Sequence, residues 1–296
     1  METTEALRKK MHTTEDLQAV VKTMKTLAAV NIRHYQTAVE ALAQYNRTVE
    51  MGLRIVLRQR PERPVRAKPG LRRRLGAIVF GSDQGMCGVL NEQVASHATT
   101  AMEASGIASH ERTLVAIGRR VAGLLEDAGQ RLEEHLPAPS SVAAITAMVQ
   151  DLVVRIEAWH AMQGCDQIVL FYPRLLAGAT YRPYTFHLLP VDLEWLQRLE
   201  RQPWPSRALP IFTMNADRLF SALIHQYLFV SLYRALAESL ASENASRLAS
   251  MQAAERNIME RLEELNAQFH RQRQVSITEE LLDIVAGYEA LAGEQS

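Results

Sequence analysis

Proline is missing from both ends of this 296-residue chain: none precedes Pro61 and none follows Pro210. Because proline breaks helices, its absence permits very long helices at the two ends. The prolines and most glycines lie in the middle of the chain, where turns are therefore expected.

Cysteine is also scarce, with only Cys87 and Cys165, which are far apart and form no CxxC pair. This excludes a disulfide scaffold and a zinc ribbon, and both residues are expected to be reduced packing residues of a cytosolic protein. The nine histidines are scattered without an HExxH motif. No metal site and no cofactor are predicted.

Long apolar runs and excess charge are absent as well. The most apolar window, Leu219–Leu236, is broken by His225, Gln226 and Arg234, whereas a membrane span needs about 20 apolar residues. A buried helix is therefore predicted, with no transmembrane segment. The opening residues 1–5 do not resemble a signal peptide. A formal net charge of zero gives no overall field for nucleic acid, so no nucleic-acid partner is predicted.

The first segment carries a repeat of three and four residues, which is typical of a coiled-coil helix. The seam of this helix is predicted to consist of Leu7, Met11, Thr14, Gln18, Val21, Met24, Ala28, Asn31, Tyr35, Val39, Leu42, Asn46, Val49, Leu53 and Val56.

The last segment repeats the pattern, and a helix is expected from about Asn215 to Leu291. Its seam is predicted at Leu240, Asn244, Leu248, Met251, Glu255, Ile258, Leu262, Leu265, Phe269, Gln272 and Ser276. Each seam needs an apolar partner, so the two helices are expected to pair antiparallel. The second helix is longer, and its surplus must contact something else.

The middle of the chain alternates short apolar runs with helical stretches, which indicates βαβ units and a mostly parallel sheet. Strands are predicted at LGAIVF, RTLVAI, CDQIVLFYP and ATYRPYTFHLLPV, and ERQPWPSRALP is predicted to be a loop. The fold class is therefore α/β: a Rossmann-like central domain with a long antiparallel coiled coil of terminal helices. Four parts are predicted: a coiled-coil helix (1–57), a basic linker (58–74), the α/β domain (75–210) and a coiled-coil helix (211–296).

The glycine-rich stretch GSDQGMCGVLN, residues 81–91, lies where phosphate-binding loops occur, between a strand and a helix. It matches neither GxGxxG nor a Walker A loop. A structural turn is predicted, with Ser82 and Asp83 as capping residues and no direct nucleotide binding. Ser82 lacks the context of a nucleophile, and no catalytic residues are predicted.

Polar residues interrupt the second seam at HRQRQ, residues 270–274. Arg273 and Gln274 have the donors to bind carboxylates of another chain, but an exposed polar turn explains them equally well. For Met24, simple packing in the seam is the alternative to a binding role.

Three stretches resemble the gamma subunit of F-type ATP synthases: KTMKTLAAVNIRHYQ (22–36), GSDQGMCGVLN (81–91) and the stretch from Ser242 to Leu291. Departures from the family pattern include Ala19, Thr23, Asn31 and His270, and they are similar to the divergent N-ATPase-like subfamily. The paired-cysteine insertion of chloroplast gamma chains is absent.

The resemblance implies a non-catalytic central-stalk rotor that couples ion-driven rotation of a membrane c-ring to ATP synthesis or hydrolysis at beta subunits. It implies alpha, beta and epsilon subunits and the c-ring as partners, and a peripheral location on the cytoplasmic face of a bacterial inner membrane. By motif position, Arg273, Gln274 and Thr278 are implied to contact the beta subunit. Met24 and Lys25 are implied to face an acidic segment of that subunit. Glu243 and Arg247 are implied to stabilise this contact.

Two other functions stay open on the residues alone. One is an α/β enzyme or nucleotide-binding regulator with a coiled-coil interaction arm, which would bind ATP near residues 81–88. The other is a scaffold that binds acidic partners through the basic linker.

Overall fold

The computed structural model describes residues 3–59, 74–176, 180–204 and 210–293, with side chains as far as 286. The predicted basic linker falls almost entirely outside these residues. The chain forms two compact units: unit 1 comprises residues 1–27 and 248–296, and unit 2 comprises residues 28–247. The division of the chain into four parts stays a prediction.

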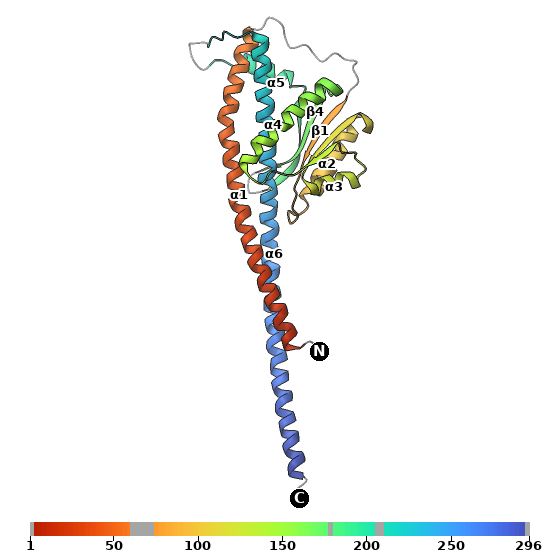
Figure 1. Ribbon diagram of the computed structural model, residues 1–296. Helices are drawn as coiled ribbons and strands as arrows, with labels where there is room; N and C mark the ends of the chain where they lie inside the picture. The colour runs from red at the N-terminus through yellow and green to blue at the C-terminus, as the bar shows by residue number, and fades with distance from the viewer. Residues whose placement is uncertain (1–2, 60–73, 177–179, 205–209, 294–296) are drawn as a thin grey trace. The chain divides into compact units, whose positions relative to one another are not determined.

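Unit 2 is built on a five-stranded sheet in the order β3-β2-β1-β4-β5 (Figure 1). The strands β1 to β4 run parallel, and β5 lies antiparallel to β4 at one edge. Ile78 of β1 lies opposite Val115 of β2 and Leu170 of β4. The strands are β1 Leu75–Phe80, β2 Arg112–Ile117, β3 Glu134–Leu136, β4 Gln167–Leu175 and β5 Tyr181–Leu189.

Helices cover both faces of the sheet because its central strands are apolar on both sides. Ala77 and Val79 of β1 pack with α2 (Leu90–Ala104) and α3 (Arg119–Asp127) in one core. Ile78 and Phe80 point the other way, into a core with α4 (Val142–Ala158) and α6 (Ala216–Gly293). A π-helical turn, Trp159–Gln163, continues α4. The predicted α/β class is confirmed.

The terminal helices pair antiparallel in unit 2. α1 (Thr4–Gln59) approaches α6 through Asn31 with Asn244, and through Tyr45 with Gln226. Since the residue numbers rise along one helix and fall along the other, the directions are opposite. The predicted seams are confirmed, because all of their positions are buried or half-buried while most intervening residues are exposed.

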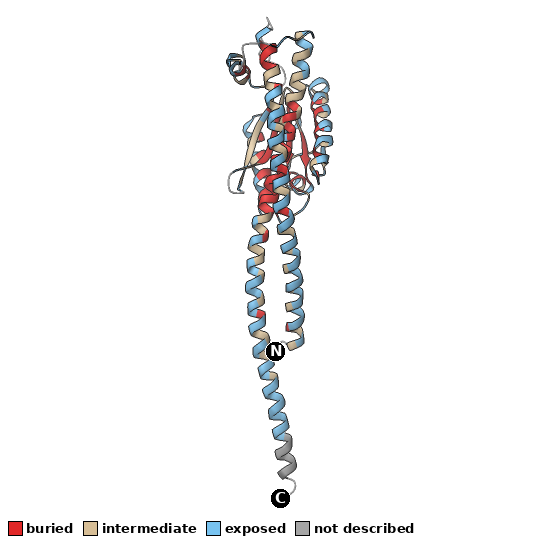
Figure 2. Cartoon of the chain, turned by 90° about the vertical axis from the view of Figure 1, so that its left-hand side faces the viewer, coloured by how far each residue is buried: buried red, intermediate tan, exposed pale blue. Residues whose placement is uncertain are grey.

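The described residues of unit 1 lie almost entirely on α1 and α6. Figure 2 shows that most of its surface is exposed, with half-buried residues along the line where the helices meet. Leu7, Met251 and Leu265 are its buried hydrophobic residues. The remaining seam positions are half-buried, as a two-stranded coil predicts.

One helix was not expected from sequence. α5 (Leu193–Arg201) begins at Asp192, whose side chain accepts from the Glu194 amide, and it buries Leu196 and Leu199. Its last residues fall within the predicted loop of residues 200–210. A short 3₁₀ turn at Ser109–Glu111 also precedes β2. In the described parts of the chain, no helix has both the length and the apolar character needed to cross a bilayer.

Candidate functional site

The C-terminal part of α6 carries the polar segment singled out in the sequence. Gln272 and Ser276 are half-buried on the seam, whereas Arg271, Arg273 and Gln274 are exposed. The seam of α6 therefore continues through Gln272, and the polar residues on either side of Gln272 point away from α1.

Arg273 and Gln274 lie on different sides of α6. Gln274 lines a shallow depression with Val275 and Thr278. Arg273 lines a second one beside the start of α1, with Thr4, Glu5, Arg8, Phe269, Ser276, Ile277 and Glu280. Consecutive helical residues are rotated by about 100°, so this separation follows from helical geometry. The structure brings Gln274 and Thr278 together and places Arg273 apart.

The Thr278 hydroxyl donates to the Gln274 carbonyl at 2.9 Å. This bond is a local helical contact. The bond uses the single proton of the hydroxyl, but the hydroxyl oxygen can still accept a hydrogen bond.

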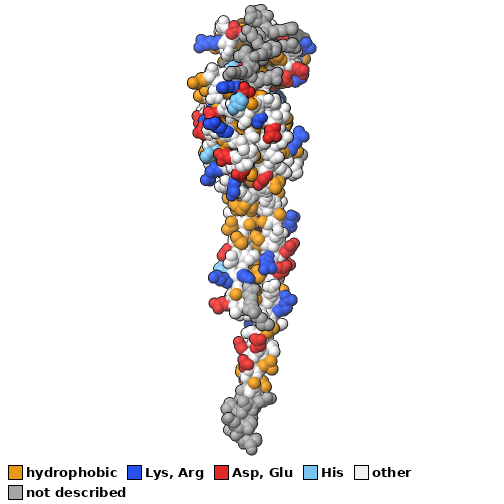
Figure 3. All heavy atoms as spheres, turned by 90° about the vertical axis from the view of Figure 1, so that its right-hand side faces the viewer, with side chains coloured by type: hydrophobic (Ala, Val, Ile, Leu, Met, Phe, Trp, Pro, Cys, Tyr) orange, Lys and Arg blue, Asp and Glu red, His pale blue; other side chains and the backbone are white. Residues whose placement is uncertain are grey.

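Large apolar side chains surround these polar groups. Leu281, Leu282 and Ile284 are 57%, 62% and 68% exposed, and Val275 and Val285 are also exposed. On the face drawn in Figure 3, acidic and hydrophobic side chains lie together on this part of α6. A contiguous set of exposed apolar residues with polar neighbours is typical of a protein-binding surface. We call α6 residues 271–285 the terminal surface.

Met24 and Lys25 lie on α1 in unit 1. Met24 is half-buried on the seam. The Lys25 ammonium forms an ion pair with Glu255 of α6, with Nζ and Oε2 2.5 Å apart. Both side chains keep partial exposure, 31% and 23%. In this structure the lysine charge is thus already matched within the chain.

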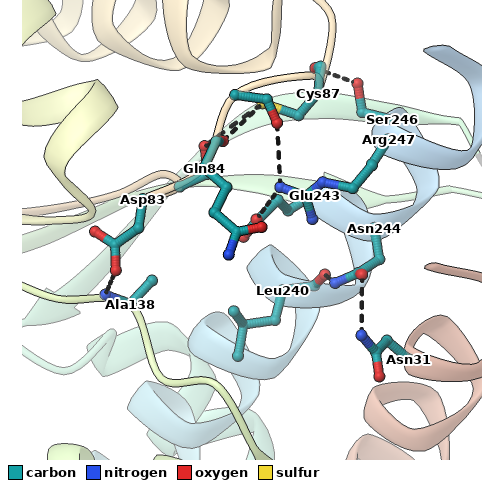
Figure 4. A network of polar contacts seen from close by, with 12 residues as sticks. Asn31, Asp83, Gln84, Cys87, Ala138, Leu240, Glu243, Asn244, Ser246 and Arg247 are labelled. Atoms are coloured by element: carbon teal, nitrogen blue, oxygen red, sulfur yellow. Dashed lines mark hydrogen bonds and ion pairs between the residues drawn. The ribbon is translucent and has the colours of Figure 1, made fainter. Parts of the chain in front are cut away.

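Glu243 and Arg247 lie inside unit 2, at 7% and 8% exposure. The Arg247 guanidinium donates to the Glu243 carboxylate at 2.7 Å and, more weakly, to the Gly85 carbonyl at 3.4 Å. Burial raises the pKa of Glu243, and the Arg247 charge partly offsets this. Both side chains therefore point into the glycine-rich loop and away from solvent (Figure 4).

The glycine-rich loop, residues 81–88, is held by its own side chains. Asn91 accepts from the Ser82 amide and donates to the Ser82 hydroxyl, both at 2.9 Å. Asp83 accepts from the amides of Arg119 and Ala138, at 2.9 Å each, and so ties the start of α3 to the segment before α4. A side chain at Gly81 would meet Val121 at 2.4 Å. This agrees with the structural role predicted for the loop.

Two residues that sequence reasoning missed connect this loop and the sheet to α6. The Ser246 hydroxyl donates to the Cys87 carbonyl. The Ser242 hydroxyl shares its proton between the Pro173 carbonyl of β4 and the Glu238 carbonyl of its own helix, both at 2.8 Å. The available signal was the recurrence of polar residues every fourth position in α6, at Glu238, Ser242 and Ser246. Both cysteines are buried free thiols, as expected.

Comparisons with known proteins agree with this architecture. A family model described as ATP synthase matches residues 3–291. The ATP synthase gamma chain of Acaryochloris marina is 29% identical, with 97% of this chain and 98% of that one covered. The gamma chain of Nitrosospira multiformis is 25% identical, with coverage of 96% and 98%.

Solved structures share the fold at lower identity. A chain of the Euglena gracilis mitochondrial ATP synthase OSCP/F1/c-ring structure aligns with a TM-score of 0.66 at 16% identity, covering 99% of this chain and 96% of that one. A chain of the Tetrahymena thermophila central stalk/c-ring structure aligns with a TM-score of 0.56 at 19% identity, covering 79% and 99%. Since the family model spans nearly the whole sequence, the chain belongs to the gamma-chain family of F-type ATP synthases.

Proposed function

We propose that this chain is the central-stalk rotor of an F-type ATP synthase, peripheral on the cytoplasmic face of a bacterial inner membrane. It couples ion-driven rotation of a c-ring to ATP synthesis or hydrolysis at beta subunits and does no bond chemistry itself. Its partners are the alpha and beta subunits, the epsilon subunit and the c-ring. Two solved structures that share its fold, a central stalk/c-ring assembly and an OSCP/F1/c-ring assembly, support this assignment.

The terminal surface is the observation that carries the proposal. It combines exposed hydrogen-bonding groups at Arg273, Gln274 and Thr278 with exposed leucines, and the described part of α1 leaves these groups exposed. The apolar side chains give such a surface affinity for a partner but do not determine its orientation. The polar groups determine the orientation, because hydrogen bonds are directional.

Unequal contacts are what a rotor needs. A protein can shift the equilibrium of a neighbour only through different interaction free energies with that neighbour's states. Because Gln274 and Arg273 lie on different sides of α6, different beta subunits surrounding the helix would meet different donors. The nucleotide sites of these beta subunits would then differ in affinity at any moment.

We include Lys25 and Met24 in the contact with a beta subunit, but Lys25 does not act there as a free charge. Lys25 is paired with Glu255, so an acidic segment of a beta subunit would share the lysine instead of meeting a free charge. Met24 would contribute through the seam that positions Lys25. Glu243 and Arg247 would act indirectly, by fixing α6 where it crosses the glycine-rich loop.

The direct test replaces Arg273 and Gln274 by alanine in a complex reconstituted with alpha, beta, epsilon and membrane subunits. Ion pumping per ATP hydrolysed should fall severalfold, because each lost charge-assisted hydrogen bond is worth about 1.5–3 kcal/mol. Folding of the chain should be unchanged, since both residues are exposed.

A matched control is Gln252→Ala with Arg256→Ala, the same residue types at exposed positions of the same helix. Pumping that stays normal in the first variant, or falls equally in the control, would refute the role of Arg273 and Gln274. If the unaltered chain fails to support ATP-driven pumping at all, the rotor proposal itself is wrong.

A further inference from the structure

The carboxyl ends of β1 and β4 are where an open parallel sheet normally binds its ligand. Such ligands bind outside the strand ends, at the position where the strand order changes direction. In the order β3-β2-β1-β4, the chain moves from β1 to β2 and β3 on one side and places β4 on the other. The crevice of this α/β domain therefore lies between β1 and β4.

α6 lies across this crevice. Ser246 donates to the Cys87 carbonyl in the loop that follows β1, and Arg247 reaches the Gly85 carbonyl in the same loop (Figure 4). The Ser242 hydroxyl lies 2.8 Å from the Pro173 carbonyl near the carboxyl end of β4 and 2.8 Å from the Glu238 carbonyl of its own helix, and its single proton is shared between these two acceptors. β1 pairs with β4 only as far as Phe171, so Pro173 lies beyond the last paired position.

The polarity of these contacts is opposite to that of a phosphate-binding loop. Loops that bind phosphate present backbone N–H groups to the anion. Here the loop presents the carbonyls of Gly85 and Cys87, which accept from α6. The Ser82 amide is already bonded to Asn91 at 2.9 Å. The loop is thus arranged to hold hydroxyl and guanidinium donors.

Three contacting residues, Glu238, Ser242 and Ser246, form a regular row, and Arg247 lies beside its end; we call these four residues the polar ladder. Residues four apart share one helix face. Glu238 continues the row to the sheet through an ion pair with Arg174 of β4, at 3.8 Å. Ser242 is fully buried and the others are at most 9% exposed, so water does not compete for these bonds.

Directional bonds do what apolar packing alone cannot. Apolar side chains that slide or roll past each other keep most of their contact, because the hydrophobic effect is non-directional. A hydroxyl that donates to one carbonyl loses its bond after a displacement of about 1 Å, since acceptable distances span only about 2.5–3.2 Å. The polar ladder therefore fixes both the rotation and the axial position of α6 against the sheet.

We propose that the ligand crevice of this α/β domain has become a socket for the chain's own α6, and that the polar ladder locks the helix in it. The occupancy of the crevice is independent of the proposed function. The mechanical consequence, that torque passes between α6 and the α/β domain through these bonds, rests on the rotor proposal.

The test uses the full chain with Ser242→Ala and Ser246→Ala together, and Ser221→Ala as control. Ser221 is an exposed serine of the same helix, and serine-to-alanine changes remove only the hydroxyl. Hydrogen exchange is followed in peptides covering residues 81–91 and, as an internal reference, residues 112–117 of β2. The double variant should exchange roughly thirtyfold faster in 81–91 with β2 unchanged, because two lost bonds of about 1 kcal/mol each amount to about 2 kcal/mol.

Equal exchange in the double variant and the control would overturn the socket. Slower exchange of residues 81–91 in the unaltered chain after ATP is added would also overturn the socket, because the crevice would then be free to bind a ligand. Faster exchange in β2 as well as in the loop would indicate general unfolding and count against a local lock. Each single variant is then measured. The lock is rejected unless one single variant exchanges faster in the loop alone.

The same variants are then placed in the reconstituted complex. If the unaltered chain supports ATP-driven pumping and the double variant pumps less per ATP, the ladder transmits torque. Normal pumping by the double variant, with a loosened loop, refutes the torque role alone. Failure of the unaltered chain refutes the rotor proposal and leaves the exchange result standing.

Discussion

Glu255 occupies a seam position where the repeat calls for an apolar residue, and Lys25 on α1 compensates for it. A charge on the seam of a helix pair specifies register, because slipping the helices would leave it unmatched. Asn31 and Asn244 make a second polar contact at 3.4 Å, in unit 2. Polar seam pairs thus define which residues of α1 and α6 face each other.

Replacing Lys25 by methionine should destabilise unit 1 by about 1 kcal/mol, because Glu255 would keep its half-buried charge without a partner. The charge swap Lys25→Glu with Glu255→Lys should restore most of the loss. Hydrogen exchange in residues 3–27 measures both effects. Lys22→Met, at an exposed position of the same helix, is the control, and equal exchange in the two methionine variants would exclude a register role.

At the scale of the element, α6 passes through three environments from residue 235 onward. Residues 235–247 are buried on every side, residues 248–276 are most buried along the seam, and residues 277–286 are exposed throughout. A helix that is buried on all sides is part of a core, and a helix that is buried along one stripe pairs with a neighbouring helix. An exposed helix with apolar side chains is typical of a surface that binds another chain.

Substitutions at two leucines of α6 distinguish the paired part of the helix from the exposed part. Leu265→Ala should cost roughly 2–4 kcal/mol of unit 1 stability, since Leu265 is only 2% exposed. Leu282→Ala should cost less than about 0.5 kcal/mol in the free chain, since Leu282 is 62% exposed. Thermal unfolding of both variants checks this. Leu282→Ala should instead weaken binding to the alpha–beta ring, and an equal loss of stability in both variants would contradict the division.

The repeat along the chain was enough to predict both long helices, their seams and their antiparallel pairing, because helical periodicity is a local property. α5 was missed because it is short and lies between prolines. The polar ladder was not predictable, since the Ser246–Cys87 contact joins residues 159 positions apart. The roles of Arg273 and Gln274 stay predictions, and a rotation of about 100° per residue places the two side chains on different sides of α6.

At the scale of the whole molecule, the two units differ in how they are held together. All three hydrophobic clusters found in the described residues belong to unit 2. Unit 1 relies on a narrow seam with Leu7, Met251 and Leu265 as its buried hydrophobic residues. Regions with few buried contacts open by local unfolding at lower free energy than a core.

Native-state hydrogen exchange of the free chain should therefore show at least about tenfold faster exchange in unit 1 than in β1 and β4. Binding to the alpha–beta ring should slow unit 1 most, because a ligand that binds only the folded form stabilises it. Uniform protection along the chain would mean that the two units open as one, contrary to this expectation.

The complete burial of residues 235–247 also limits how this stretch of α6 can change. A larger side chain placed on an ordinary surface helix can bend toward solvent, but here the helix is buried among α1, α4, the sheet and the glycine-rich loop. The stretch is accordingly rich in alanine and serine, with Ala235, Ala237, Ser239, Ala241, Ser242, Ala245 and Ser246. In a library of substitutions across α6, this stretch should therefore be the least tolerant of larger side chains.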